Sequence, residues 1–84
     1  MAIQVLFFAS LREALGVSAL SYELSSAVAT VGALRESLAA KGGDWLALAP
    51  GRAVRAAVNQ DMVGAAHPLK DGDEVAFFPP VTGG

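Results

Sequence analysis

The sequence predicts an α+β domain in which a mixed β-sheet packs on one main helix. Apolar residues alternate with other residues in the segments Ile3–Ala9 and Glu74–Phe78, as expected of strands that bury one face. Between these segments, Val31, Leu34 and Leu38 recur at helical spacing. Strands at both ends of a short chain, with a helix between them, favour one sheet that is covered on one face.

A first, short helix is expected directly after the first strand. Ser10-Leu11-Arg12-Glu13 has the composition of a capping box, with Ser10 as N-cap and Glu13 reaching back to it. Gly16 should end this helix in a left-handed conformation. Ala19–Leu24 is then predicted as the second strand, paired beside the first like a hairpin.

The main helix should begin after Thr30, whose hydroxyl can cap it, and should stop at Gly42-Gly43. Gly32 weakens this helix by up to about 1 kcal/mol relative to alanine, so the prediction depends on the apolar stripe. One further helical turn is expected over Trp45–Ala49.

Val54–Asn59 is predicted as the third strand, followed by a tight turn at Asn59-Gln60-Asp61 and a short return strand at Met62-Val63. With the last strand at the end of the chain, the predicted order is β-α-β-α-β-β-β. The sequence therefore predicts one domain over residues 1–78 and a flexible C-terminal Gly-Gly tail over residues 79–84.

The composition excludes several classes of function. The 84 residues contain no cysteine, which removes disulfides, thiolate nucleophiles and cysteine-based metal sites. The net charge is −2 and the six basic residues are spread along the chain, so there is no electrostatic footprint for nucleic acid. The apolar run Val5–Ala9 is too short for a membrane span or a signal sequence. We expect a soluble, cytoplasmic protein that binds neither nucleic acid nor membrane.

The polar side chains suggest no active site. His67 precedes a proline in a predicted turn and is interpreted as a solvated histidine without a nearby partner. Asp71, Asp73 and Glu74 are interpreted as a solvated turn, with a contact to a basic partner as the alternative. Metal ligation needs more and better-spaced donors. No glycine-rich phosphate-binding motif is present, so any ATP must be bound by another protein. We therefore expect no bound cofactor, no metal and no enzymatic activity of the chain alone.

Strand parity indicates a partner surface. The residues expected to face the helix are Ile3, Val5, Phe7, Val58, Val75 and Phe77. Leu6, Phe8 and Phe78 then point out of the opposite face, where Phe8 and Phe78 on neighbouring strands would form a contiguous apolar patch. The alternative is that the Trp45 segment or a loop covers this patch. We favour a binding surface just upstream of the tail.

The C-terminal carboxylate is the candidate reactive group. Pro79-Pro80 should stiffen the start of the tail, whereas Gly83 and Gly84 lack Cβ atoms and can enter a narrow channel. A carboxylate is a poor electrophile, so Gly84 must first be activated, most simply as an acyl-adenylate formed from ATP. The activated carbonyl could then accept sulfur, giving a thiocarboxylate, or an amine, giving an isopeptide. The residues do not distinguish these two outcomes.

The element order and the terminal Gly-Gly resemble the ubiquitin-like β-grasp fold. Four further stretches are similar to the small, sulfur-carrying subunits of molybdopterin synthase (MoaD-type). These stretches are Val5-Leu6-Phe7-Phe8-Ala9 with Arg12-Glu13, Ala56-Ala57-Val58-Asn59-Gln60, His67-Pro68-Leu69, and Asp71-Gly72-Asp73-Glu74-Val75-Ala76-Phe77-Phe78-Pro79-Pro80-Val81-Thr82-Gly83-Gly84. The last is the most specific, since Gly-Gly alone is shared with ubiquitin and with the sulfur carrier of the thiamine pathway.

The resemblance implies a role as sulfur carrier in molybdenum cofactor biosynthesis. An E1-like adenylyltransferase would use Mg-ATP to adenylate Gly84, and sulfur from a persulfide donor would convert it to a thiocarboxylate. The tail would insert into the large synthase subunit and donate sulfur to cyclic pyranopterin monophosphate, building the dithiolene of molybdopterin. In the family, two small and two large subunits form a heterotetramer. The tail residues that would insert are Pro80, Val81, Thr82 and Gly83, and the partner-binding positions are Phe8, Arg12, Met62 and Phe78.

Two alternatives belong to other classes of function. The chain could be a ubiquitin-like protein modifier that is attached to lysines, or a sulfur carrier of another pathway such as thiamine synthesis or tRNA thiolation. It could also be an interaction domain in which the terminal glycines have no chemical role.

Overall fold

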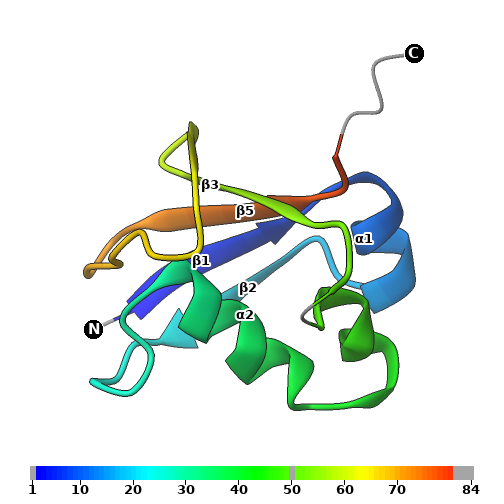
Figure 1. The fold of residues 1–84 in the computed structure, drawn as a ribbon, viewed down its shortest axis with the longest axis horizontal. Helices are drawn as coiled ribbons and strands as arrows, with labels where there is room; N and C mark the ends of the chain where they lie inside the picture. The colour runs from blue at the N-terminus through cyan, green and yellow to red at the C-terminus, as the bar shows by residue number, and fades with distance from the viewer. Residues whose placement is uncertain (1, 50, 81–84) are drawn as a thin grey trace.

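A computed structural model describes residues 2–49 and 51–80 of the chain (Figure 1). The elements follow in the order β1 (Ala2–Phe7), α1 (Ala9–Leu15), β2 (Ala19–Glu23), α2 (Val31–Ala39), the 3₁₀ helix η1 (Gly43–Leu48), β3 (Arg55–Val58), β4 (Asp61–Val63) and β5 (Glu74–Phe78). The strands form one sheet in the order β2-β1-β5-β3-β4. The central strands β1 and β5 are parallel and the other pairs are antiparallel. The predicted mixed sheet with one main helix is confirmed.

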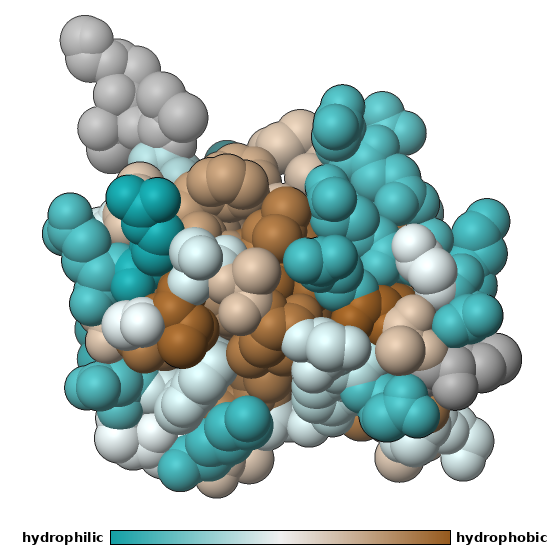
Figure 2. Space-filling model, turned by 180° about the vertical axis from the view of Figure 1, so that it is seen from behind, coloured by the Kyte–Doolittle hydropathy of each residue, from teal (hydrophilic) through white to brown (hydrophobic). Residues whose placement is uncertain are grey.

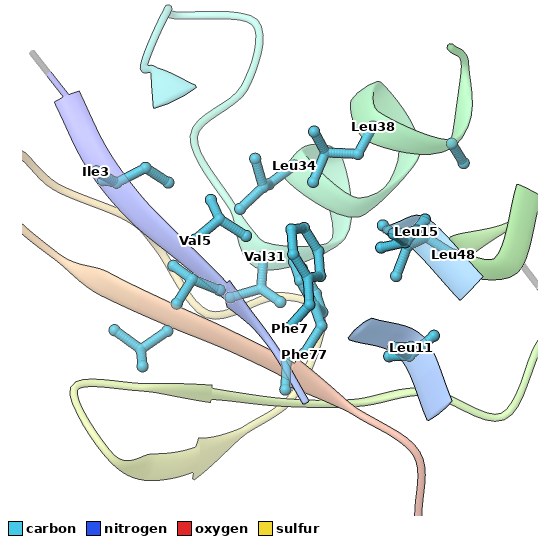
Figure 3. Close-up of a cluster of buried hydrophobic side chains, with 14 residues drawn as sticks. Ile3, Val5, Phe7, Leu11, Leu15, Val31, Leu34, Leu38, Leu48 and Phe77 are labelled. Carbon is cyan, nitrogen blue, oxygen red and sulfur yellow. The ribbon is translucent and has the colours of Figure 1, made fainter. Parts of the chain in front are cut away.

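The core lies between the sheet and α2 with η1, and Figure 3 shows side chains of these elements pointing toward one another. Phe7 and Phe77 stack with their ring centroids 6.2 Å apart, and the rings of Trp45 and Phe7 form a T-shaped pair with centroids 5.7 Å apart. All six residues predicted to face the helix are buried. The strand parity predicted from the sequence is therefore correct, and it leaves the alternate residues on the opposite face of the sheet.

The predicted capping box at the start of α1 is wrong. The N-cap is Phe8, which makes no side-chain cap, and Ser10 already lies inside the helix. The cause is tertiary: the amide of Phe8 donates to the carbonyl of Phe77 at 3.2 Å, so the chain stays on the sheet up to this residue and turns at once. Ala9 makes that turn with a φ of 54°. Gly16 ends the helix in the left-handed conformation, as predicted.

The start of α2 agrees with the sequence. The Thr30 hydroxyl accepts a hydrogen bond from the amide of Ala33 at 3.2 Å, which confirms the predicted N-cap. Gly32 also has a packing role, because its amide donates to the carbonyl of Ala65 at 2.8 Å. A Cβ on Gly32 would lie 3.1 Å from both the Cβ and the carbonyl oxygen of Ala65. Glycine thus lets the loop before β5 approach the first turn of α2.

Arg35 fastens the segment between η1 and β3 to the main helix. Its guanidinium donates to the carbonyls of Leu48 at 2.7 Å, Ala49 at 2.9 Å and Arg52 at 2.8 Å. Charge-assisted hydrogen bonds of this kind are stronger than those between neutral groups. They help to hold in place the segment that leads from η1 into β3.

The turn between β3 and β4 is tighter than predicted. Asn59 and Gln60 both have positive φ, at 50° and 74°, as in a two-residue type I′ turn. Asp61 pairs with Val58 and belongs to β4 rather than to the turn. The last strand, β5, has the predicted bounds, whereas η1 begins two residues before the predicted turn over Trp45–Ala49 and ends one residue before its end. Among the described residues, no helix has the length and apolarity needed to cross a membrane.

Candidate functional site

One apolar row crosses the whole sheet on the face opposite α2. Leu6 pairs with Ala19 on one side and with Ala76 on the other, Ala76 pairs with Ala57, and Ala57 pairs with Met62. These residues alternate with the core residues of each strand, so they lie on the opposite face. The row ends at Met62, which is 61% exposed. Figure 2 views the molecule from this side and shows hydrophobic residues gathered across its middle.

A second, shorter row contains the two phenylalanines predicted from parity. Phe8 extends β1 by one residue, is bonded to β5 through the carbonyl of Phe77, and is 47% exposed. Phe78 closes β5 and is partly buried. We call the surface made by both rows the apolar sheet face; it comprises Leu6, Phe8, Ala19, Ala57, Met62, Ala76 and Phe78.

The sequence identified only part of this surface. Met62 lies on the outermost strand, and Ala57 and Ala76 connect it to the other members through the strand pairing. These two alanines were missed, because only the register of β3 against β5 reveals that they share a row. Trp45 packs on Phe7 in the core, so the alternative that the Trp45 segment covers the patch is wrong.

Arg12 lies at the edge of the apolar sheet face. It follows Phe8 by four residues, one turn along α1, and its amide is bonded to the carbonyl of Phe8 at 3.4 Å. Arg12 is exposed. The structure thus brings three of the four predicted contact residues, Phe8, Arg12 and Phe78, to one end of the sheet, with Met62 at the far strand.

The tail begins at the same end of the sheet. β5 ends at Phe78, and Pro79 and Pro80 are partly buried. The other predicted tail residues, Val81, Thr82, Gly83 and the candidate reactive Gly84, lie outside the described residues. The apolar sheet face is thus continuous with the start of the segment that should carry the chemistry.

Asp73 is buried, which corrects the interpretation of the acidic cluster as a solvated turn. Its side chain accepts hydrogen bonds from the Asn59 amide and from the backbone amide of Lys70, both at 2.9 Å. Asp71 accepts one from the amide of Ala2 at 2.9 Å. Both aspartates are therefore structural, because they connect the loop before β5 to the β3–β4 turn and to the start of β1.

The groups around Asp73 lower the pKa of its carboxyl group. Burial alone would raise the pKa of Asp73, but the hydrogen bonds from Asn59 and Lys70 and the nearby positive charges of Lys70 and His67 together lower it. His67 is partly buried rather than fully solvated, and its charge has the smallest of the effects that lower the pKa of Asp73. In the described part of the chain, no cluster of three or more histidine or acidic residues could hold a metal ion.

Asp73→Asn is expected to destabilise the domain by about 1–3 kcal/mol, because one of the two partly buried donors would face an amide group that cannot accept. The pKa of Asp73 is lower in the folded state, so its ionisation contributes stability at pH values above its unfolded pKa, about 3.9. That contribution is lost as the pH falls through the folded pKa. Urea unfolding from pH 7 to pH 2 should show that the free energy of unfolding falls less for Asp73→Asn than for the parent. An unchanged pH profile would contradict this assignment.

Comparison with known proteins identifies the family. A model of the ThiS family matches residues 5–84. The molybdopterin synthase sulfur carrier subunit of Escherichia coli (strain K12) is 55% identical over 83 residues, which cover 98% of this chain and 99% of that relative. In the complex of subunits 1 and 2 of the molybdopterin-converting factor from Helicobacter pylori 26695, a chain with 27% identity aligns over 100% of both chains with a TM-score of 0.67.

A second structural neighbour is named for a different role. Small archaeal modifier protein 1 from Methanosarcina acetivorans has a TM-score of 0.74 and 28% identity, and the match covers 99% of this chain and 96% of that one. The fold and these neighbours define a ubiquitin-like β-grasp protein, as predicted. The chain belongs to the ThiS family, as a member of the molybdopterin synthase sulfur carrier subunits.

Proposed function

We propose that this chain carries sulfur as a C-terminal thiocarboxylate on Gly84 and delivers it within molybdopterin synthase. An E1-like adenylyltransferase uses Mg-ATP to convert the carboxylate to an acyl-adenylate, because AMP is a far better leaving group than oxide. The outer sulfur of a persulfide donor then attacks the acyl carbon and displaces AMP, giving an acyl disulfide. A thiol of the donor cleaves this acyl disulfide, which releases the thiocarboxylate and leaves a disulfide on the donor. The chain itself binds neither ATP nor metal in this scheme and works in the cytoplasm.

The apolar sheet face is the observation that carries the proposal. A surface that is apolar across all five strands, ending beside the tail, suits a partner that must hold the domain while the tail enters a channel. The Helicobacter pylori neighbour was solved as a complex of subunits 1 and 2 of its factor. We infer that the large synthase subunit covers this face, in a heterotetramer of two small and two large chains.

The delivery step follows from this docking. The tail residues Pro80–Gly83 enter the large subunit, and Gly84 presents its sulfur to cyclic pyranopterin monophosphate. Two thiocarboxylated chains are consumed for each dithiolene of molybdopterin, one sulfur from each, and each chain leaves with its terminal carboxylate restored. Six extended residues reach up to about 20 Å, so a channel of that depth can separate the reacting carbonyl from the docked domain.

Reconstitution with purified components tests the proposal. The protein is incubated with the activating enzyme, Mg-ATP and a persulfide source, and its intact mass should change by the exchange of one oxygen for sulfur. The thiolated protein and the large subunit should then convert the pyranopterin precursor. Thiolation without conversion would place the chain in another sulfur pathway, such as thiamine synthesis or tRNA thiolation.

The likeness to small archaeal modifier protein 1 supports a second candidate, attachment to lysines of other proteins. Immunoblots of native cell lysate separate the two functions. A carrier gives a single band at the size of the free chain, whereas a modifier gives a ladder of larger conjugates that disappears when Gly84 is removed.

A further inference from the structure

Arg55 lies beside Phe78 on the apolar sheet face, although neither composition nor resemblance singled it out. It is the first residue of β3 and pairs directly with Phe78 on β5. The next residue, Ala56, belongs to the core, so the side chain of Arg55 is on the opposite face of the sheet. Arg55 is exposed.

Arg55 and Arg12 each lie next to one of the two phenylalanines. Arg12 lies one helical turn from Phe8, and Arg55 lies across the strand pair from Phe78. Within residues 2–49 and 51–80, no hydrogen bond or ion pair engages either guanidinium. The guanidinium of Arg35 differs, because three carbonyls of the same chain accept its hydrogen bonds.

Charge is separated along the strands of the sheet. Since β3 runs antiparallel to β5, the end that carries Arg55 is opposite the end that carries Asp61, Asp71, Asp73 and Glu74. Glu13 follows Arg12 on α1, but consecutive helical residues point about 100° apart. The end of the apolar sheet face where the tail begins is therefore flanked by cations that have no acidic partner among the described residues.

We propose that Arg55, together with Arg12, forms a cationic rim that pairs with carboxylates of the large subunit around the opening that receives the tail. This inference depends on the proposed function. A planar guanidinium binds a carboxylate through two parallel hydrogen bonds, and arginine is enriched at interfaces. Charges at the rim of an interface mainly raise the association rate and select the orientation of docking, and they do so less as salt increases.

Binding to the purified large subunit tests the rim by stopped-flow or surface plasmon resonance. The variants are Arg55→Gln and, as a matched control at the other end of the sheet, Lys70→Gln. Each changes the formal net charge from −2 to −3, so the overall electrostatic effect is the same. At low salt we expect Arg55→Gln to slow association about 3- to 10-fold, and Lys70→Gln by less than about 2-fold.

The salt dependence separates charge from packing. At 1 M salt the screening length falls to about 3 Å, so the difference between Arg55→Gln and the parent should disappear. Equal effects of the two variants, or a deficit of Arg55→Gln that persists at 1 M salt, would overturn the cationic rim. In both cases the parent would still bind the large subunit, and the proposed function would stand. A parent that does not bind the large subunit at all would count against the proposed function itself.

Discussion

Removal of Gly84 is expected to abolish the exchange of oxygen for sulfur at the C-terminus. The new terminus would lie one residue short of the activating site, a displacement of up to about 3.5 Å. A misplacement of only about 1 Å can slow an acyl transfer on the order of 10²-fold, so a full residue should leave no measurable product. Intact mass after incubation with the activating enzyme, Mg-ATP and a persulfide source gives the result.

Two controls make this prediction specific. The shortened chain should unfold at the same urea concentration as the parent, because the helices and strands of the described residues all lie within residues 2–78. Gly83→Val keeps the length but adds a branched side chain, so it should slow thiolation through steric crowding alone. Thiolation of the shortened chain at the parent rate would refute Gly84 as the sulfur-bearing residue.

Phe78→Ala is expected to weaken binding to the large subunit by roughly 30-fold, a loss of about 2 kcal/mol, while the domain stays folded. Phe78 lies on the apolar sheet face and is only partly buried, so its truncation leaves no cavity in the core. An aromatic side chain near the centre of an interface is typical of residues that dominate binding energy.

The neighbouring residue provides a matched control. Phe77 is 0% exposed and stacks on Phe7, so Phe77→Ala should destabilise the domain by about 3–5 kcal/mol. The two variants remove the same side chain from adjacent positions on β5, one on each face of the sheet. Phe77→Ala should therefore lower the stability measured by urea unfolding, whereas Phe78→Ala should lower the affinity measured by titration with the large subunit. If Phe78→Ala mainly lowers stability and leaves the affinity of the folded fraction unchanged, the apolar sheet face is not the docking surface.

Local patterns in the sequence were sufficient where the deciding contact is local. The Thr30 cap is formed with a residue three positions on, and Gly16 satisfies the end of its own helix. The apolar alternation of β5 requires nothing beyond the strand itself. These features depend on neighbouring residues, so the sequence contains the information that decides them.

The errors arise where a distant segment competes with a local preference. Ser10 is a residue type that often caps helices. The hydrogen bond from Phe8 to Phe77 instead makes Phe8 the last residue on the sheet, so α1 begins at Ala9, before Ser10. Asp73 is a residue type that is common in solvated turns. The side chain of Asn59, fourteen positions before it, donates a hydrogen bond that satisfies the buried carboxylate.

By itself, the sequence determined the α+β class, the faces of β1, β3 and β5 that enter the core, and the candidate chemistry of Gly84. These properties follow from residue type and from periodicity, which every segment carries independently. Only the tertiary structure decided that Ala57, Ala76 and Met62 join Leu6 in one apolar row, and that Arg55 lies beside Phe78. Strand order and register create those neighbours, because residues far apart in the chain meet only after β3 pairs with β5.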